Sequence, residues 1–276
     1  MEKQATKINQ KGKKLVVLGF VSIAILFLLY ARYQDPILLT PDAIEPIQRI
    51  AYAFYVILLM SFGAIAYGLY IYHKYKIEKN ETDTLTIIAI TIWNKRSKKI
   101  FAATFIAYGI FFSLVSGTLV YQPEVNFSYH YGAKIPSAVI IPCCDQPGYM
   151  PEILVYLTNH VGLQIIPINL VLQVIVSFLV ALNIAIAVNA FSISKKTRSA
   201  STIGAATGLF IACPTCAGSF LSLFVGTASG IALTLALVQL QTLFIAISIP
   251  VLLITPIIMA KKLRNSDGTC AFEPMK

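Results

Sequence analysis

Long runs of apolar residues without a charged side chain dominate this sequence. Six such runs occur, each about 17 residues or longer, and a helix of that length can cross a hydrocarbon layer of roughly 30 Å. Only 12% of the residues are charged, whereas a soluble domain usually carries about 25%. The chain is therefore predicted to be a polytopic membrane protein. The predicted spans are residues 15–31, 50–72, 100–121, 166–190, 203–225 and 231–259.

The fold class follows from the need to satisfy backbone hydrogen bonds inside lipid. Helices satisfy these bonds within one segment, whereas closed barrels satisfy them between strands of about ten residues with alternating polarity. The apolar runs of this chain do not alternate in that way. We therefore predict an all-α bundle of six transmembrane helices, forming a single membrane domain over residues 1–276.

The distribution of Lys and Arg predicts how the bundle is oriented. With the N-terminus inside, 19 of the 22 basic residues fall in inner segments, and the outer segments keep Arg32, Arg49 and Lys134. This bias satisfies the positive-inside rule at every loop. It predicts a multi-pass protein of the cell membrane with both termini in the cytoplasm. The positive-inside distribution then accounts for the net charge of +10. The expected partner is therefore the lipid bilayer and not nucleic acid.

The largest segment between spans is the outer loop at residues 122–164. Pro151 suits the start of a helix, and a one-sided apolar stripe follows it. The stripe consists of Ile153, Leu154, Leu157 and Val161. We expect a short interfacial helix here. An inner apolar stretch at residues 85–93 is too short to cross and is expected to lie along the membrane surface.

The most informative motif is Cys213-Pro214-Thr215-Cys216 in the fifth predicted span. Cys213 lies roughly 15 Å along a helix from the inner boundary near Thr202, which is close to the middle of the membrane. The two thiols are three residues apart and share a helix face. Pro214 removes one backbone hydrogen bond, and a helix broken there would place both cysteines at an N-terminus that favours a thiolate.

A thiolate in this position can exchange with disulfides or bind a soft cation such as Cu(I). The outer loop carries a second pair, Cys143 and Cys144. In the redox hypothesis, Cys213, Cys216, Cys143 and Cys144 are the reactive residues, and electrons pass between the embedded and the outer pair. Whether this chemistry makes the protein an enzyme stays open at this point.

This arrangement resembles that of membrane disulfide-forming quinone reductases, including the vitamin K epoxide reductase type, in which an embedded C-x-x-C motif meets loop cysteines. The resemblance covers only the motif at Cys213 to Cys216 and the pair Cys143 and Cys144. Those families place the motif nearer the outer surface of a smaller bundle, and their loop cysteines are separated rather than adjacent. The resemblance implies a quinone as cofactor for the redox hypothesis.

In the metal hypothesis, copper is the cofactor or cargo, and the ligands are Cys213 and Cys216 with the outer histidines His130 and His160. Sulfur and imidazole nitrogen are ligands that soft and borderline metals prefer. The spacings of these residues match no zinc signature.

Two further hypotheses need no reactive thiol. Small residues recur every four positions at Gly204, Gly208, Ala212 and Cys216, and such a strip allows close helix packing, as in a non-catalytic subunit that binds other membrane subunits. Alternatively, polar side chains such as Asn183 and Gln239 could line a channel for a neutral solute. The predicted span interiors contain no Asp, Glu, Lys, Arg or His, which argues against a proton pump or a charged-solute symporter.

Overall fold

The computed structural model describes residues 2–34, 44–78, 85–86, 88–89, 94–142, 148–194, 249–258 and 261. The chain divides into two compact units. The first comprises residues 1–79 and 110–174, and the second comprises residues 80–109 and 175–276. Each unit is described by itself below.

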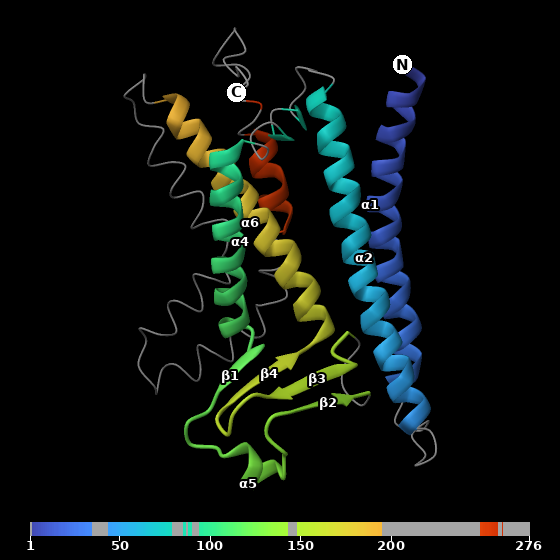
Figure 1. The fold of residues 1–276 in the computed structure, drawn as a ribbon, viewed down its shortest axis with the longest axis vertical. Coiled ribbons are helices and arrows are strands. Elements are labelled where there is room, and N and C mark those ends of the chain that lie inside the picture. The colour runs from blue at the N-terminus through green and yellow to red at the C-terminus, as the bar shows by residue number, and fades with distance from the viewer. Residues whose placement is uncertain are drawn as a thin grey trace. The chain divides into compact units, whose positions relative to one another are not determined.

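Four helices of the described chain are long and apolar enough to cross a membrane. They are α1 (Glu2–Tyr30), α2 (Ile44–Glu78), α4 (Lys95–Val115) and α6 (Pro167–Ser194) (Figure 1). These helices coincide with the first four predicted spans and support a helical membrane protein. A short apolar helix at Ile249–Ile258 falls within the sixth predicted span. The fifth predicted span and the rest of the sixth lie outside the described residues.

A four-stranded antiparallel sheet follows α4 in the chain, so the prediction of an all-α fold is wrong in this part. Its strand order is β1-β4-β3-β2. The strands are β1 (Leu119–Tyr121), β2 (Ser137–Ile141), β3 (Glu152–Tyr156) and β4 (Val161–Ile165). A short helix, α5 (Phe127–Tyr131), lies between β1 and β2. The segment predicted to be the outer loop is therefore mainly a small sheet in its described residues, and it belongs to the first unit.

The interfacial helix expected after Pro151 is also wrong, because β3 and β4 form a hairpin there, with Val155 opposite Leu163. Leu157 and Thr158 close the hairpin, since both backbone N–H groups donate to the carbonyl oxygen of Val161. Strands of five residues rich in Val, Ile and Tyr favour this pairing.

The third predicted span ends earlier than residue 121. Helix α4 stops at Val115, and Gly117 has a φ of +72°, in the left-handed region that glycine enters without steric cost. The chain then enters β1, which pairs with β4. Backbone groups at residues 119–121 are thus satisfied by a neighbouring strand and not by a helix.

Helices α1 and α2 form an antiparallel hairpin held together by small residues. A Cβ atom added at Gly68 would lie 2.9 Å from the carbonyl oxygen of Gly12, and one added at Gly19 would lie 2.5 Å from Ile65 Cγ1. The hydroxyl of Ser61 donates to Ser22 Oγ at 3.1 Å across the same contact. In lipid, the hydrophobic effect does not drive helices together. Helices associate there through close packing, which small side chains allow.

The second unit has its core around α6. Val176, Leu179 and Val180 pack with Leu252 of the short helix at Ile249–Ile258. Asn183, which is buried, donates from Nδ2 to the carbonyl oxygens of Leu179 (2.8 Å) and Leu252 (3.0 Å). This geometry favours a helix-packing role for Asn183 over the lining of a solute path.

The short apolar stretch at residues 85–93 belongs to the second unit. Its described residues are helical, and Ile88 packs in a buried cluster with Leu182 and Ile186 of α6.

Candidate functional site

The connection from β2 to β3 contains the predicted outer pair, Cys143 and Cys144. Because of this pair, the sheet is the candidate functional region of the first unit. Cys143 and Cys144 themselves lie outside the described residues, as do Cys213 and Cys216. The described chain resumes on either side of residues 143–147, at Pro142 and at Gly148. The hydrogen bonds of Pro142 and Gly148 hold the two ends of the chain that flank residues 143–147.

Pro142 is tied to the end of α1. The hydroxyl of Tyr30, the last residue of α1, donates to the carbonyl oxygen of Pro142 at 2.5 Å. The Tyr30 side chain is buried, with 3% of its surface exposed. A hydrogen bond from a buried hydroxyl holds its acceptor in place, because breaking the bond costs free energy where water has little access.

Gly148 is tied to the start of α6 within the same unit. The backbone N–H of Ile168 donates to the carbonyl oxygen of Gly148 at 3.1 Å. Gly148 has a φ of +92°, so the turn after the cysteine segment needs glycine at this position. A Cβ atom there would also lie 3.6 Å from Ile168 and 3.8 Å from Phe27.

A second tyrosine holds the strands that follow. The hydroxyl of Tyr55, in α2, lies 2.6 Å from the carbonyl oxygen of Pro151 and 3.0 Å from that of Ile165. Pro151 precedes β3, and Ile165 ends β4. Tyr55 therefore connects both strands of the hairpin to helix α2.

Aromatic packing fixes both tyrosines. The ring of Phe54 makes edge-to-face contacts with Phe27, Tyr30 and Tyr55, at centroid separations of 5.4, 5.1 and 5.6 Å. Such contacts add stability beyond the area that they bury. We name Phe27, Tyr30, Phe54 and Tyr55 the aromatic anchor.

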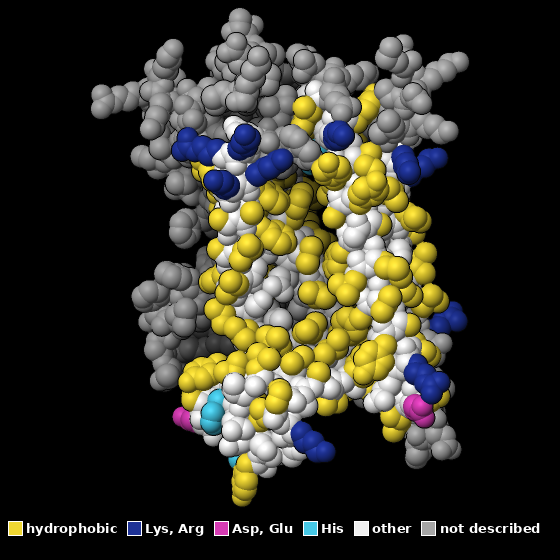
Figure 2. Space-filling model, viewed as in Figure 1, with side chains coloured by type: hydrophobic (Ala, Val, Ile, Leu, Met, Phe, Trp, Pro, Cys, Tyr) yellow, Lys and Arg dark blue, Asp and Glu magenta, His cyan; other side chains and the backbone are white. Residues whose placement is uncertain are grey.

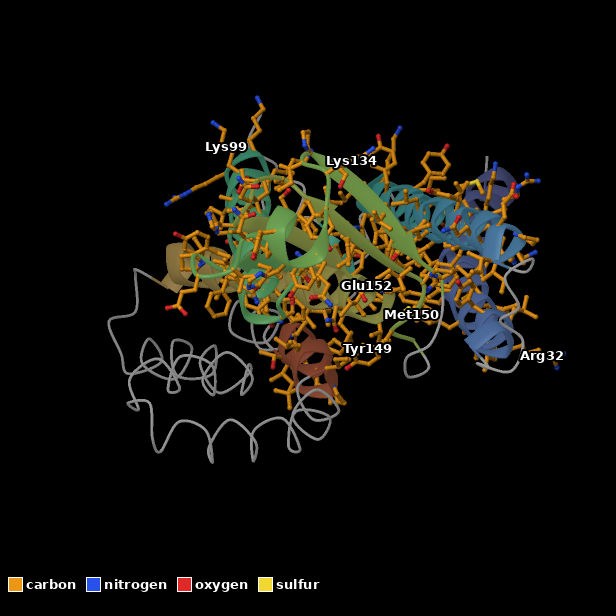
Figure 3. All side chains as sticks on the ribbon, turned by 90° about the horizontal axis from the view of Figure 1, so that it is seen from below. Arg32, Lys99, Lys134, Tyr149, Met150 and Glu152 are labelled. Carbon is orange, nitrogen blue, oxygen red and sulfur yellow. The ribbon has the colours of Figure 1, made fainter. Side chains whose placement is uncertain are left out.

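The chain around the start of β3 is partly buried. Met150 is 5% exposed and Glu152 is 8% exposed, whereas Tyr149 is exposed. Figure 3 labels all three where they enter β3. Glu152 pairs in register with Ile141 of β2, one residue before Pro142. A thioether and a carboxyl group are thus placed next to the chain that leads to the cysteine segment.

His160, one of the two predicted metal ligands of the outer loop, holds a turn together. Its Nδ1 lies 3.2 Å from the carbonyl oxygen of Gln122 and 3.0 Å from that of Val125. Carbonyl oxygens only accept, so Nδ1 carries a proton, and in the neutral ring the lone pair is then on Nε2. This arrangement of Nδ1 is also the one that orients metal-ligating histidines.

His130, the other predicted ligand, lies on the exposed surface of α5 next to the ring of Tyr129. Within the part of the chain that the structure describes, His, Cys, Asp and Glu form no group of three or more that could hold a metal ion. The described residues therefore provide no complete metal site around His130 and His160.

Sequence reasoning missed the residues that dock the sheet. Tyr30 and Tyr55 lie inside predicted spans as two among many aromatic residues, and their partners are 112 and 96 positions away in the chain. The sequence did offer one signal: Tyr30 and Tyr55 are tyrosines near the end of a predicted span. Such tyrosines often lie at the boundary between the apolar membrane interior and its polar surface.

No protein-family model matches this sequence, and neither a curated protein nor a solved structure is significantly similar to it.

Proposed function

We propose that the protein performs thiol chemistry at the outer boundary of the membrane, with Cys143 and Cys144 as the outer pair and Cys213 and Cys216 as the embedded pair. The observation that carries the proposal is the anchoring on both sides of residues 143–147. Tyr30 holds Pro142 on one side, and Ile168 holds Gly148 on the other.

The anchored residues Pro142 and Gly148 lie next to the segment that carries the outer pair. Cys143 follows Pro142 directly, and consecutive Cα atoms are about 3.8 Å apart. The proposal therefore places the outer pair near the end of α1, where Tyr30 bonds to Pro142. Thiols that must meet a partner within the membrane benefit from being held there, because a defined position raises their effective concentration.

The proposed exchange needs one thiolate and one disulfide. One cysteine pair is reduced, and the other is oxidised to a disulfide. A thiolate of the reduced pair attacks a sulfur of the disulfide, a mixed disulfide forms, and the thiolate that leaves takes up a proton. The remaining thiol of the attacking pair then attacks the mixed disulfide and completes the transfer. Two electrons and two protons have then moved from one pair to the other. The same thiolates could instead pass Cu(I) between the pairs.

The proposal includes six spans with both termini in the cytoplasm. It is supported by the placement of charge along the hairpin of the first unit. Lys11, Lys13 and Lys14 lie near the start of α1 and Lys74 near the end of α2, whereas Arg32 and Arg49 lie near the ends that dock the sheet. The lysine-rich end is then the cytoplasmic end.

The double variant Cys213→Ser, Cys216→Ser tests the thiol chemistry in the full-length protein in its native membrane. We expect the outer pair to change its oxidation state, because its exchange partner is gone, or bound copper to fall if the pair carries metal. Differential alkylation with mass spectrometry measures the first, and elemental analysis of the purified protein measures the second. The matched control is Cys270→Ser, which should change neither. An unchanged oxidation state together with an unchanged copper content would refute the proposal.

A further inference from the structure

Pro256 leaves one backbone group without its usual partner in the short helix at Ile249–Ile258, which is red in Figure 1. We name this segment the proline helix. In an α-helix, each carbonyl oxygen accepts a hydrogen bond from the N–H group four residues later. The residue four positions after Leu252 is Pro256, which has no N–H and whose ring crowds that carbonyl group. The carbonyl oxygen of Leu252 therefore needs a donor from outside its own helix.

Asn183 of α6 supplies this donor. Its Nδ2 donates to the carbonyl oxygen of Leu252 at 3.0 Å and to that of Leu179, one turn earlier on α6, at 2.8 Å. Carbonyl oxygens only accept, so the NH2 group of the amide, and not its oxygen, faces the proline helix. The oxygen, Oδ1, is buried and has no hydrogen-bond partner in the part of the chain that the structure describes. Asn183 thus acts in this contact as a donor, with both of its N–H groups in use.

Water has little access to this contact. Leu252 is 2% exposed and Asn183 is 4% exposed, and Leu252 packs in a buried cluster with Val176 and Val180 of α6. The first part of α4 belongs to the same unit, and Figure 2 shows yellow apolar side chains along this helix, below the dark blue side chains at its start. In apolar surroundings, a backbone group freed by proline is tolerated where a neighbouring helix supplies its partner.

We propose that Pro256 and Asn183 form a releasable latch between α6 and the proline helix. Pro256 makes a hinge, because the backbone hydrogen bond that would stiffen the helix at Leu252 is missing. The amide of Asn183 closes the latch by donating to the carbonyl oxygen that the hinge leaves open. When this bond breaks, residues 253–258 pivot at the hinge while α6 stays in place. The inference does not depend on the thiol chemistry.

The strength of such a bond suits a contact that opens and closes. A side-chain hydrogen bond between two membrane helices changes an equilibrium by about threefold to about fifteenfold. Folding equilibrium constants of whole domains are much larger, about 10³ to 10⁸. The latch can therefore open while the rest of the chain stays folded.

Hydrogen–deuterium exchange of the full-length protein in detergent tests the latch through a double-mutant cycle, with mass spectrometry reporting on residues 253–258. In the parent protein, Asn183→Leu should raise the exchange rate of these amides about tenfold, because Leu252 loses its donor. In a Pro256→Ala background, the new backbone N–H at position 256 donates to Leu252. There, the same Asn183→Leu substitution should raise the rate by no more than about twofold. An equal rise in both backgrounds, or no rise in either, would overturn the proposal.

Thr255→Val is the matched control. The hydroxyl of Thr255 also donates to a carbonyl oxygen of the proline helix, that of Val251, at 2.7 Å. Val251 has a backbone donor as well, the N–H of Thr255 four residues later, so loss of the hydroxyl should change the exchange rate by less than about twofold. A rise as large as that of Asn183→Leu would show that any lost side-chain bond loosens the helix, and it would contradict the role of Pro256.

A measurement on the unmodified protein covers the case in which Asn183→Leu does not fold. Amides of residues 253–258 should exchange roughly tenfold faster than those of residues 176–186 of α6, because local opening exposes only the segment that moves. One common exchange rate for both segments would mean that they open only together, and it would contradict the latch.

Discussion

Replacing Gly68 with leucine is expected to force α1 away from α2 and to lower the free energy of unfolding by about 3 kcal/mol or more. A Cβ atom at this position would lie 2.9 Å from both the carbonyl oxygen of Gly12 and Val16 Cγ2. The Gly12 oxygen belongs to the backbone of α1, so it cannot move without moving the helix. Thermal unfolding of the purified full-length protein in detergent measures the loss.

Gly63→Leu is the matched control for this substitution, since it lies on the same helix. A Cβ atom at Gly63 would meet no atom within 4 Å among the described residues, so this variant should unfold close to the temperature of the parent protein. Equal losses of stability in the two variants would show that side-chain size alone, and not the contact with α1, is responsible.

Replacing Tyr55 with alanine is expected to detach the β3–β4 hairpin from α2. Loss of a large buried aromatic side chain costs about 3–5 kcal/mol. It also removes the hydroxyl that holds the carbonyl oxygens of Pro151 and Ile165, which adds the cost of leaving a buried acceptor without its donor. Limited proteolysis of the protein in lipid should then cleave the strands of the sheet faster than in the parent protein.

Tyr52→Ala is the control for this prediction, because Tyr52 lies one turn away on the same helix and is 60% exposed. Its loss should leave the cleavage rate of the sheet nearly unchanged. Similar protection of the sheet in the parent protein and in Tyr55→Ala would contradict the docking role of Tyr55.

Four of the six predicted spans correspond to helices that are long and apolar enough to cross a membrane. They could be predicted because a membrane imposes a minimum length and an apolar character on any helix that crosses it. Hydropathy does not determine the start and end of each helix. Helix α2 extends beyond its predicted span on both sides, to Ile44 and Glu78, since polar residues outside the hydrocarbon layer can continue a helix. Hydropathy does not report where such an extension stops.

The sheet could not be predicted from the same signal. Ile153, Leu154, Leu157 and Val161 fit one helix face, yet Ile153 and Leu154 belong to β3, Val161 starts β4, and Leu157 lies in the turn between them. A stripe of four residues is too short to distinguish a helical period from two short strands. The Val, Ile and Tyr content of residues 152–165, together with the turn at Thr158 and Asn159, was the better indicator.

The candidate site was predictable only in part. Sequence singled out the cysteine motifs and the two histidines, because their chemistry is carried by residue type and spacing. The aromatic anchor was not predictable, because Tyr30 and Tyr55 bond to backbone carbonyl oxygens. Every residue has a carbonyl oxygen, so the residue types do not indicate which one accepts the bond. The roles of the four cysteines stay predictions, since these residues lie outside the described chain.

Everything proposed for the thiols requires that the sheet and the outer pair face the side of the membrane opposite the lysine-rich end. Alkylation with a membrane-impermeant maleimide, applied to sealed vesicles of known orientation, measures this directly. In vesicles with the outer face exposed, we expect Cys143 or Cys144 to react and Cys270 to react only after the vesicles are opened. Reaction of Cys270 in sealed vesicles, with protection of Cys143 and Cys144, would place the sheet in the cytoplasm and contradict the proposed function.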